Sequence, residues 1–214
     1  MTDFAAARRT MVENQLRTYD ITDHTVLAAF ETVQREVFVE GRQSAIAYLD
    51  RELTARDGKT RLLTPMVHAR FVQALEIRPG ETALDVGGAG YGAAILKACG
   101  AHVTAVETDA DAARVALKTA NVADVEVVAG DAGAGAPGKG PFDIIMVHGS
   151  AELAPESLLA QLKDGGRLAI VMGHGRSGRA TLFRKVGKSV SRARVFDAAA
   201  PALPAFNRAS EFTF

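Results

Sequence analysis

Three acidic side chains occupy matching positions in the sequence, at or just beyond the ends of three successive apolar runs. They are Asp85, Glu107 and Asp131. Short runs of this kind are typical of parallel strands buried on both faces, and the carboxyl ends of such strands meet at one edge of a sheet. Carboxylates at that edge accept hydrogen bonds from hydroxyl, amino or ammonium groups of a ligand. One such acid alone is as readily a solvent-exposed turn residue, but three in register favour a binding site.

A glycine-rich turn follows the first acid, with the sequence DVGGAGYG at positions 85–92. Gly87, Gly88 and Gly90 allow the backbone to approach a bound nucleotide closely. The pattern that begins at Gly88 formally matches the dinucleotide fingerprint G-x-G-x-x-A, and Glu107 lies about 20 residues further on, where that fold places an acid that binds ribose. The turn by itself is therefore compatible with both a nicotinamide dinucleotide and S-adenosylmethionine.

The charge of Asp85 distinguishes these two cofactors. A carboxylate just ahead of the glycines attracts the ammonium and sulfonium groups of S-adenosylmethionine, whereas it would repel a pyrophosphate. Glu107 is placed to accept hydrogen bonds from the ribose hydroxyls, and Asp131 from an adenine amino group. The three acids together favour S-adenosylmethionine as the cofactor, with an NAD-dependent enzyme as the alternative.

The elements that must position these acids lie after Gly80. Five near-continuous apolar runs of strand length alternate there with helical stretches, which predicts a parallel sheet. The runs are 83–86, 103–106, 125–128, 144–147 and 168–172, and the candidate crossover helices are 92–99, 110–120 and 155–162. Helices cover both faces of such sheets, and ligands bind beyond the carboxyl ends of the strands. The expected fold is therefore α/β, a Rossmann-like, doubly wound, mostly parallel sheet in three αβα layers.

Before Gly80, apolar residues recur at helical spacing, which predicts a helical N-terminal extension. We expect residues 1–64 to pack on a core of residues 65–214, so that the chain forms one structural domain. Thr64 is suited to cap a helix in which Pro65 takes the first position, because a proline there loses no hydrogen bond. The apolar tail after residue 197 contains prolines, so it is expected to pack across the domain without forming a helix.

Composition excludes several classes of protein. The 25 Lys and Arg residues balance 25 Asp and Glu residues, so the chain lacks the basic excess that favours nucleic acid or anionic membranes. The basic segment 173–194 is expected to be a solvated hairpin surface rather than an RNA-binding face. A single cysteine, Cys99, excludes an intramolecular disulfide, and the five histidines have no paired metal spacing. We expect a cytoplasmic monomer or weak homodimer without metal, nucleic acid or membrane partners.

Several motifs lie in a specific order along most of the chain. They are MVENQL at 11–16, VQREVFV at 33–39, AYLDREL at 47–53, LDVG at 84–87, NV at 121–122, GD at 130–131, FDII at 142–145 and QLKDGGRL at 161–168. Together they resemble the protein-L-isoaspartate O-methyltransferase family of class I methyltransferases. The resemblance implies transfer of a methyl group from S-adenosylmethionine to the α-carboxyl group of isoaspartyl residues in aged peptides or proteins, as a step of protein repair.

The segment that precedes the predicted helix departs from the family pattern. Where relatives read Thr-Ile-Ser-x-Pro, this chain reads RLLTP at 61–65, so Leu63 takes the position of the serine that lies next to the reacting carboxylate. Thr64 either replaces that hydroxyl or only caps its helix. His68 matches a histidine that lies near the cofactor in some relatives, and the alternative is a structural histidine. Thr64 and His68 are the candidate catalytic residues.

The glycine turn departs as well, because it is one residue shorter than the family form acid-x-Gly-x-Gly-x-Gly. His148, after the fourth apolar run, is predicted either to contact substrate or to lie in a surface loop. The short turn and Leu63 favour reduced activity, since methyl transfer requires the nucleophile and the methyl group to be in line. Two further alternatives are a binding module without turnover and a methyltransferase for another carboxylate or a small molecule.

Overall fold

A seven-stranded sheet forms the centre of the computed structural model, which describes residues 3–207. The strand order is β5-β4-β3-β6-β7-β8-β9. Within this sheet, β3 to β7 are parallel, and β8 and β9 form an antiparallel hairpin at one edge. Their bounds are β3 (Thr82–Val86), β4 (His102–Glu107), β5 (Val125–Ala129), β6 (Phe142–Ala151), β7 (Leu162–Met172), β8 (Arg179–Val186) and β9 (Ser189–Asp197). Each predicted apolar run falls within one of the parallel strands, so the expected α/β sheet is confirmed.

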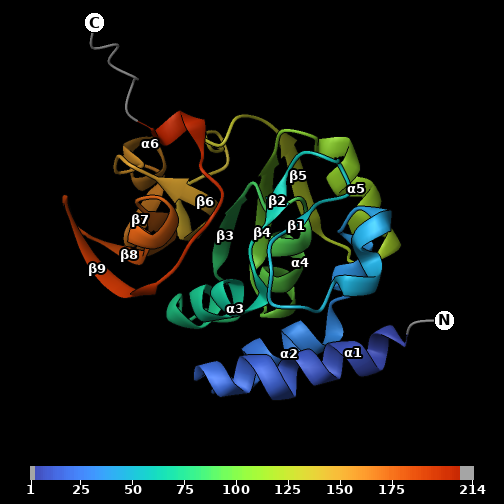
Figure 1. The fold of residues 1–214 in the computed structure, drawn as a ribbon. Helices are drawn as coiled ribbons and strands as arrows, with labels where there is room; N and C mark the ends of the chain where they lie inside the picture. The colour runs from blue at the N-terminus through green and yellow to red at the C-terminus, as the bar shows by residue number, and fades with distance from the viewer. Residues whose placement is uncertain (1–2, 208–214) are drawn as a thin grey trace, which may run out of the picture.

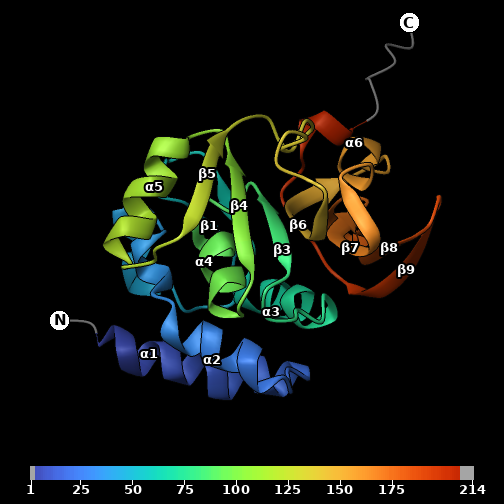
Figure 2. The same cartoon turned by 180° about the vertical axis from the view of Figure 1, so that it is seen from behind.

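Helices cover one face of the sheet more fully than the other. The well-covered face carries α1 (Phe4–Met11), α2 (His24–Thr32), α3 (Pro65–Ala74), α4 (Tyr91–Ala98) and α5 (Ala110–Thr119). The second face packs against the single turn of α6 (Glu156–Leu159), part of the loop 130–141 and the chain after β9. Figures 1 and 2 show α1 and α2 together at one end of the molecule, with α6 at the other. The third layer of the predicted αβα arrangement is therefore thin.

The N-terminal segment is helical because its local sequence caps and buries it. Oδ1 of Asp23 accepts hydrogen bonds from two amides at the start of α2, and Thr64 caps α3 through a 3.3 Å bond from the amide of Val67. Leu16 and Phe30 are fully buried in the same hydrophobic cluster as the residues of α4 and the sheet. The extension and the sheet thus share one core. A short hairpin of β1 (Leu53–Thr54) and β2 (Arg61–Leu62) leads from the extension into α3.

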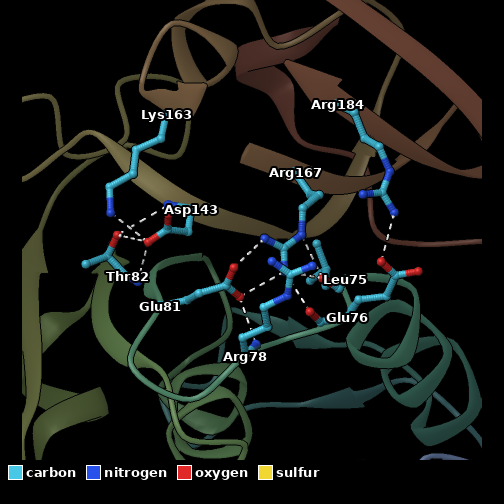
Figure 3. Close-up of polar contacts among 9 residues, drawn as sticks. All are labelled: Leu75, Glu76, Arg78, Glu81, Thr82, Asp143, Lys163, Arg167 and Arg184. Atoms are coloured by element: carbon cyan, nitrogen blue, oxygen red, sulfur yellow. Dashed lines mark hydrogen bonds and ion pairs between the residues drawn. The ribbon is translucent and has the colours of Figure 1, made fainter. Parts of the chain in front are cut away.

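Arg167 on β7 joins the end of α3 to the sheet (Figure 3). Its guanidinium donates to the carbonyl of Leu75 at 2.6 and 2.8 Å and to that of Glu76 at 2.8 Å. It also forms an ion pair with Glu81, with a shortest distance of 2.7 Å. Burial by itself would raise the pKa of Glu81, but the hydrogen bonds from Arg167 and from the amide of Arg78 lower it. Arg167 therefore satisfies carbonyls that the end of a helix leaves open.

A second contact at the amino ends of the strands centres on Asp143. Its Oδ2 accepts hydrogen bonds from the amide and the hydroxyl of Thr82, both at 2.8 Å, and lies 2.7 Å from Nζ of Lys163 (Figure 3). These contacts join β3, β6 and β7 at the edge opposite to the carboxyl ends of the strands. The polar groups at this edge are paired with one another and act as structural ties.

The chain after β9 packs on the domain, as expected. Ala202 forms a parallel bridge to Ser150, and the carbonyl of Phe206 accepts hydrogen bonds from the amides of Glu152 and Leu153. Between residues 198 and 207, the part of this segment that the structure describes, the only helical turn is a short 3₁₀ turn over Pro204–Phe206. Residues 208–214 of the predicted core lie outside the described residues. Within 3–207, no helix is long and apolar enough to cross a membrane.

Candidate functional site

Asp85 and His148 form a buried pair at the point where the sheet changes its direction of growth. β3 pairs with β4 on one side and with β6 on the other, and such a switch point is where doubly wound folds bind ligands. Oδ1 of Asp85 lies 2.6 Å from Nε2 of His148. The exposed fractions of the two residues are 0% and 3%. His148 is therefore part of the site interior and not a surface-loop residue.

The glycine turn packs directly against this pair. A Cβ atom added at Gly88 would lie closer than 3.0 Å to Oδ2 of Asp85, and one added at Gly92 would lie closer than 3.0 Å to both Asp85 and His148. Gly87 and Gly90 have φ values of +72° and +79°, a conformation that favours glycine. The turn thus makes a close backbone approach to the Asp85–His148 pair, while its predicted approach to a bound nucleotide stays a prediction.

Glu107 ends β4 beside the same turn. Its Oε1 accepts a 2.9 Å hydrogen bond from the amide of Gly90, and the residue is 2% exposed. Burial, together with the charge of Asp85, raises the pKa of Glu107 to about 8. Two buried carboxyl groups thus lie at the ends of adjacent strands. Such an arrangement favours a ligand that brings positive charge and hydrogen-bond donors.

Asp131 lies after β5, which neighbours β4, but its side chain is exposed and accepts a 2.7 Å hydrogen bond from the amide of Gly133. The structure therefore places all three predicted acids at one edge, with two buried and one in a turn. A cavity of about 510 Å³ opens beside the end of β4. Its lining includes Thr108, Asp109, Ala129 and the hairpin residues Asp57 and Thr60. That volume lies within the usual range for sites of small ligands.

His68 on α3 reaches the pair from the helical side. Its ring packs edge-on against His148 at 5.0 Å and against Tyr91 at 5.3 Å between ring centroids. Burial, and then the nearby His148 and Arg35, hold the pKa of His68 well below its usual value. His68 is consequently neutral at pH 7. The sequence analysis placed it near the cofactor or in the core, and the structure puts it within the core beside Asp85 and His148.

Arg35 is a buried residue of the site that the sequence analysis did not single out. Its Nη2 donates a 2.9 Å hydrogen bond to the carbonyl of Leu63, and its guanidinium lies 5.1 Å from the centre of the Tyr91 ring. Burial lowers the pKa of Arg35, and Tyr91 opposes this effect. The one available signal was an arginine inside the otherwise apolar segment VQREVFV. Arg35 holds Leu63 and Thr64 against the first turn of α4.

The residues Asp85, His148, His68, Tyr91 and Arg35 form a buried polar cluster with unused hydrogen-bonding capacity. Within the described part of the chain, the buried side-chain atoms of this cluster that lack a partner are Oδ2 of Asp85, Nε2 of His68, the Tyr91 hydroxyl, and Nε and Nη1 of Arg35. Each such atom costs about 1–3 kcal/mol, and native proteins seldom leave them together. These unpaired polar atoms are gathered beside the switch point, where doubly wound folds bind their ligands.

The donor and acceptor set fits S-adenosylmethionine. Oδ2 of Asp85 and the carboxyl group of Glu107 are acceptors, and the cofactor supplies an ammonium group, a sulfonium and two ribose hydroxyls. A carboxylate accepts several hydrogen bonds, so Glu107 can accept a ribose hydroxyl beside the amide of Gly90. Among residues 3–207, no group of three His, Cys, Asp or Glu side chains is placed to hold a metal ion.

The model of the family described as Protein-L-isoaspartate(D-aspartate) O-methyltransferase matches residues 6–199. This chain belongs to that family. The isoaspartate methyltransferase of Methylorubrum populi is 41% identical over 196 residues, which cover 90% of each chain. The isoaspartate methyltransferase of Koribacter versatilis is 35% identical over 92% of this chain and 90% of that protein. The expected enzyme class is thereby confirmed, and the family uses S-adenosylmethionine, the cofactor that the strand-end acids predicted.

Two solved structures of isoaspartate methyltransferases have the same fold. One is 24% identical with a TM-score of 0.80, and the alignment covers 91% of this chain and 65% of that longer chain. The other, a putative enzyme from Plasmodium falciparum in complex with S-adenosyl-L-homocysteine, is 20% identical with a TM-score of 0.74 and covers 92% of this chain and 98% of that one. The similarity extends over the helical extension as well as the sheet.

Proposed function

We propose that this isoaspartate methyltransferase family member binds S-adenosylmethionine at the carboxyl ends of β3 and β4 and methylates the α-carboxyl group of isoaspartyl residues in peptides or proteins. One observation carries the proposal. Asp85 and Glu107 are buried carboxyl groups at adjacent strand ends, and Oδ2 of Asp85 has no partner. A cationic ligand with a ribose satisfies both.

Each predicted cofactor residue has a distinct part in this proposal. Glu107 accepts the ribose hydroxyls, Asp85 accepts the ammonium group through Oδ2, and the glycine turn provides the close backbone wall. Asp131 accepts from the adenine amino group, beside the hydrogen bond that its Oδ1 already accepts from the amide of Gly133. When bound, the cofactor supplies an electrophilic methyl group on its sulfonium. Glu107 accepts a hydrogen bond from the amide of Gly90 through Oε1, and the same carboxyl group can also accept a ribose hydroxyl.

The reaction requires the protein to orient the substrate carboxylate and does not require a general base. A carboxylate is already a nucleophile, and its rate depends on alignment with the methyl group. Leu63 is buried, and its carbonyl is engaged by Arg35. Thr64 accepts the amide of Val67 through its oxygen, which leaves its hydroxyl hydrogen free to donate to a carboxylate. We assign that contact to Thr64, with neutral His68 packed behind it.

The decisive experiment measures binding first and turnover second. Calorimetry with S-adenosylhomocysteine should show binding, and NAD should not bind. Glu107→Ala should weaken binding by about tenfold to a hundredfold, because it removes charged hydrogen bonds of roughly 1.5–3 kcal/mol. Methyl-labelled cofactor should then label an isoaspartyl peptide but not the matched aspartyl peptide. Tight binding of NAD would overturn the cofactor assignment, and unchanged affinity in the variant would overturn the role of Glu107.

A second candidate function is a binding module that keeps the cofactor site without turnover. The observation that favours it is local: Leu63 replaces the family serine, and the short glycine turn is packed against Asp85 and His148. S-adenosylhomocysteine binding without labelling of any isoaspartyl peptide would support this function. Labelling of a different carboxylate would instead identify another substrate.

The rest of the proposal concerns the oligomeric state, the partners and the cellular location of the protein. We propose that the protein is a monomer or weak homodimer, that it has no nucleic-acid or membrane partner, and that it is cytoplasmic. The zero formal net charge and the single cysteine support these statements. The basic segment forms the β8–β9 hairpin, where Arg184 pairs with Glu76 and Lys185 donates to the carbonyl of Leu162. Sedimentation and a nucleic-acid binding assay test them directly.

A further inference from the structure

His148, on β6, contacts Asp85, although it lies outside every motif that carries the family resemblance. The parallel pairing of β3 with β6 ends at Val86 and Val147. His148 is therefore the first residue of β6 beyond the segment that pairs with β3. Its Nε2 lies 2.6 Å from Oδ1 of Asp85. Because an ionised carboxylate only accepts hydrogen bonds, Nε2 carries the hydrogen of this contact.

The imidazole ring of His148 is confined on three sides. Asp85 lies at its Nε2, and the His68 ring packs edge-on at 5.0 Å between ring centroids. The backbone of Gly92, on the first turn of α4, packs so closely that a Cβ atom there would overlap the ring. The His148 side chain is buried, and residues of β3, α3 and α4 contact it. The ring therefore has little freedom to leave Asp85.

The two oxygens of Asp85 differ as a result. Oδ1 is bound by His148, whereas Oδ2 is buried, has no partner and faces the glycine turn, where a Cβ atom at Gly88 would overlap it. Without His148, the carboxylate could rotate about its terminal torsion, which is broad and roughly two-fold for aspartate. The contact on Oδ1 therefore fixes the plane of the carboxylate, and with it the direction of the oxygen that faces the turn.

We propose that His148 is a positioning residue for the cofactor, which binds Oδ1 of Asp85 and thereby directs Oδ2 to the ammonium group of S-adenosylmethionine. This inference rests on the proposed function. Such an arrangement, in which an outer residue orients a ligand-binding carboxylate through a hydrogen bond, is general in ligand and metal sites. The amino-acid end of the cofactor is the only part that His148 affects, since Glu107 contacts the ribose end.

A pair of ligands separates this role from a structural one. S-adenosylhomocysteine carries the ammonium group, while methylthioadenosine contains the adenosine part without it. His148→Leu removes the hydrogen-bond donor and should weaken S-adenosylhomocysteine about tenfold to a hundredfold, the effect of one charged hydrogen bond. Methylthioadenosine should bind this variant within about twofold of the original protein. His148→Gln retains an N–H donor and should recover most of the lost affinity.

The control is His102→Leu, because His102 is an exposed histidine at the opposite end of β4. It should leave both affinities unchanged. Equal weakening of both ligands in His148→Leu would show a structural role and overturn the inference, as would unchanged binding of both. If the original protein binds neither ligand, the proposed cofactor function itself fails, and the inference with it.

A second variant, Asp85→Asn, tests the same role even if the His148→Leu protein does not fold. Asp85→Asn should also weaken S-adenosylhomocysteine and spare methylthioadenosine. When His148→Leu is added to Asp85→Asn, affinity should fall no further, because His148 acts only through Asp85. Additive losses in the double variant would overturn the inference.

Discussion

The amide of Gly90 donates a 2.9 Å hydrogen bond to Oε1 of Glu107. This contact joins the shortened glycine turn to the carboxyl group that would hold the cofactor ribose. Burial and the charge of Asp85 raise the pKa of Glu107 to about 8. A ribose hydroxyl that donates to Glu107 favours its ionised form, so cofactor binding is linked to loss of a proton from Glu107.

The first prediction is that affinity for S-adenosylhomocysteine rises with pH. Below about pH 8, Glu107 is mostly protonated in the free protein, and a cationic, hydroxyl-rich ligand favours its charged form. Binding therefore releases a proton, and Kd should fall by about tenfold or more between about pH 6.5 and pH 8.5. Calorimetry measures both Kd and proton release. Glu107→Gln should remove most of this dependence, and an unchanged pH profile in that variant would contradict the prediction.

The second prediction concerns Gly92 on α4. An alanine in a helix interior normally stabilises a protein by roughly 1 kcal/mol relative to glycine. Gly92→Ala should instead destabilise it by about 1–3 kcal/mol, because the added Cβ overlaps Asp85 and His148. Gly138→Ala is the matched control, since a Cβ there meets nothing within 4 Å. Urea unfolding compares the two, and a stabilised Gly92→Ala protein would refute the packing of this pair.

The third prediction separates structure from binding. Arg167→Met should lower the free energy of unfolding by about 3–5 kcal/mol, because it leaves Glu81 and the carbonyls of Leu75 and Glu76 without their donor. Arg184→Met removes an exposed ion pair with Glu76 and should cost no more than about 1 kcal/mol. Chemical denaturation gives both values. Cofactor affinity should stay unchanged in each, since these contacts lie at the amino ends of the strands.

The fourth prediction is that isoaspartyl methylation by this protein is weak and that Leu63→Ser raises it. By the family resemblance, Leu63 takes the position of a serine that lies next to the substrate carboxylate, and it has no hydroxyl. One hydrogen bond in the transition state changes the rate by about tenfold to a hundredfold. Leu63 is 1% exposed, so the serine should also cost stability, by roughly 2–5 kcal/mol on the scale of large-to-small core substitutions. Rates must therefore be measured below the unfolding transition. Robust turnover by the unaltered protein would contradict the prediction.

The fifth prediction tests the proposed division at residue 64. Deletion of residues 1–60 should leave a protein that is unstable or does not bind S-adenosylhomocysteine. Leu16 and Phe30 of the extension share the core with α4, and Arg35 holds the carbonyl of Leu63. Circular dichroism and calorimetry on the truncated chain provide the measurement. Full cofactor affinity after truncation would show that the extension is a separate module.

Much of the fold was predictable from local sequence because local rules determine it. Apolar runs of four or five residues indicate buried strands, and their alternation with helical segments indicates a parallel sheet. The caps at Asp23 and Thr64 involve amides only two or three residues away. Helix length was less predictable: the segment 155–162 became a single turn, Glu156–Leu159, because β7 already begins at Leu162.

The sequence by itself determined that three acids follow three successive apolar runs, and parallel strands end at one edge of a sheet. The strand order that makes β3, β4 and β5 neighbours came from the tertiary structure. Only the tertiary structure decided what those acids contact. The bond from His148 to Asp85 joins residues 63 positions apart, and that from Arg35 to Leu63 joins residues 28 apart. Such contacts depend on strand register and on how α3 and α4 pack, which are set by the sum of many weak interactions and have no signature in short stretches of sequence.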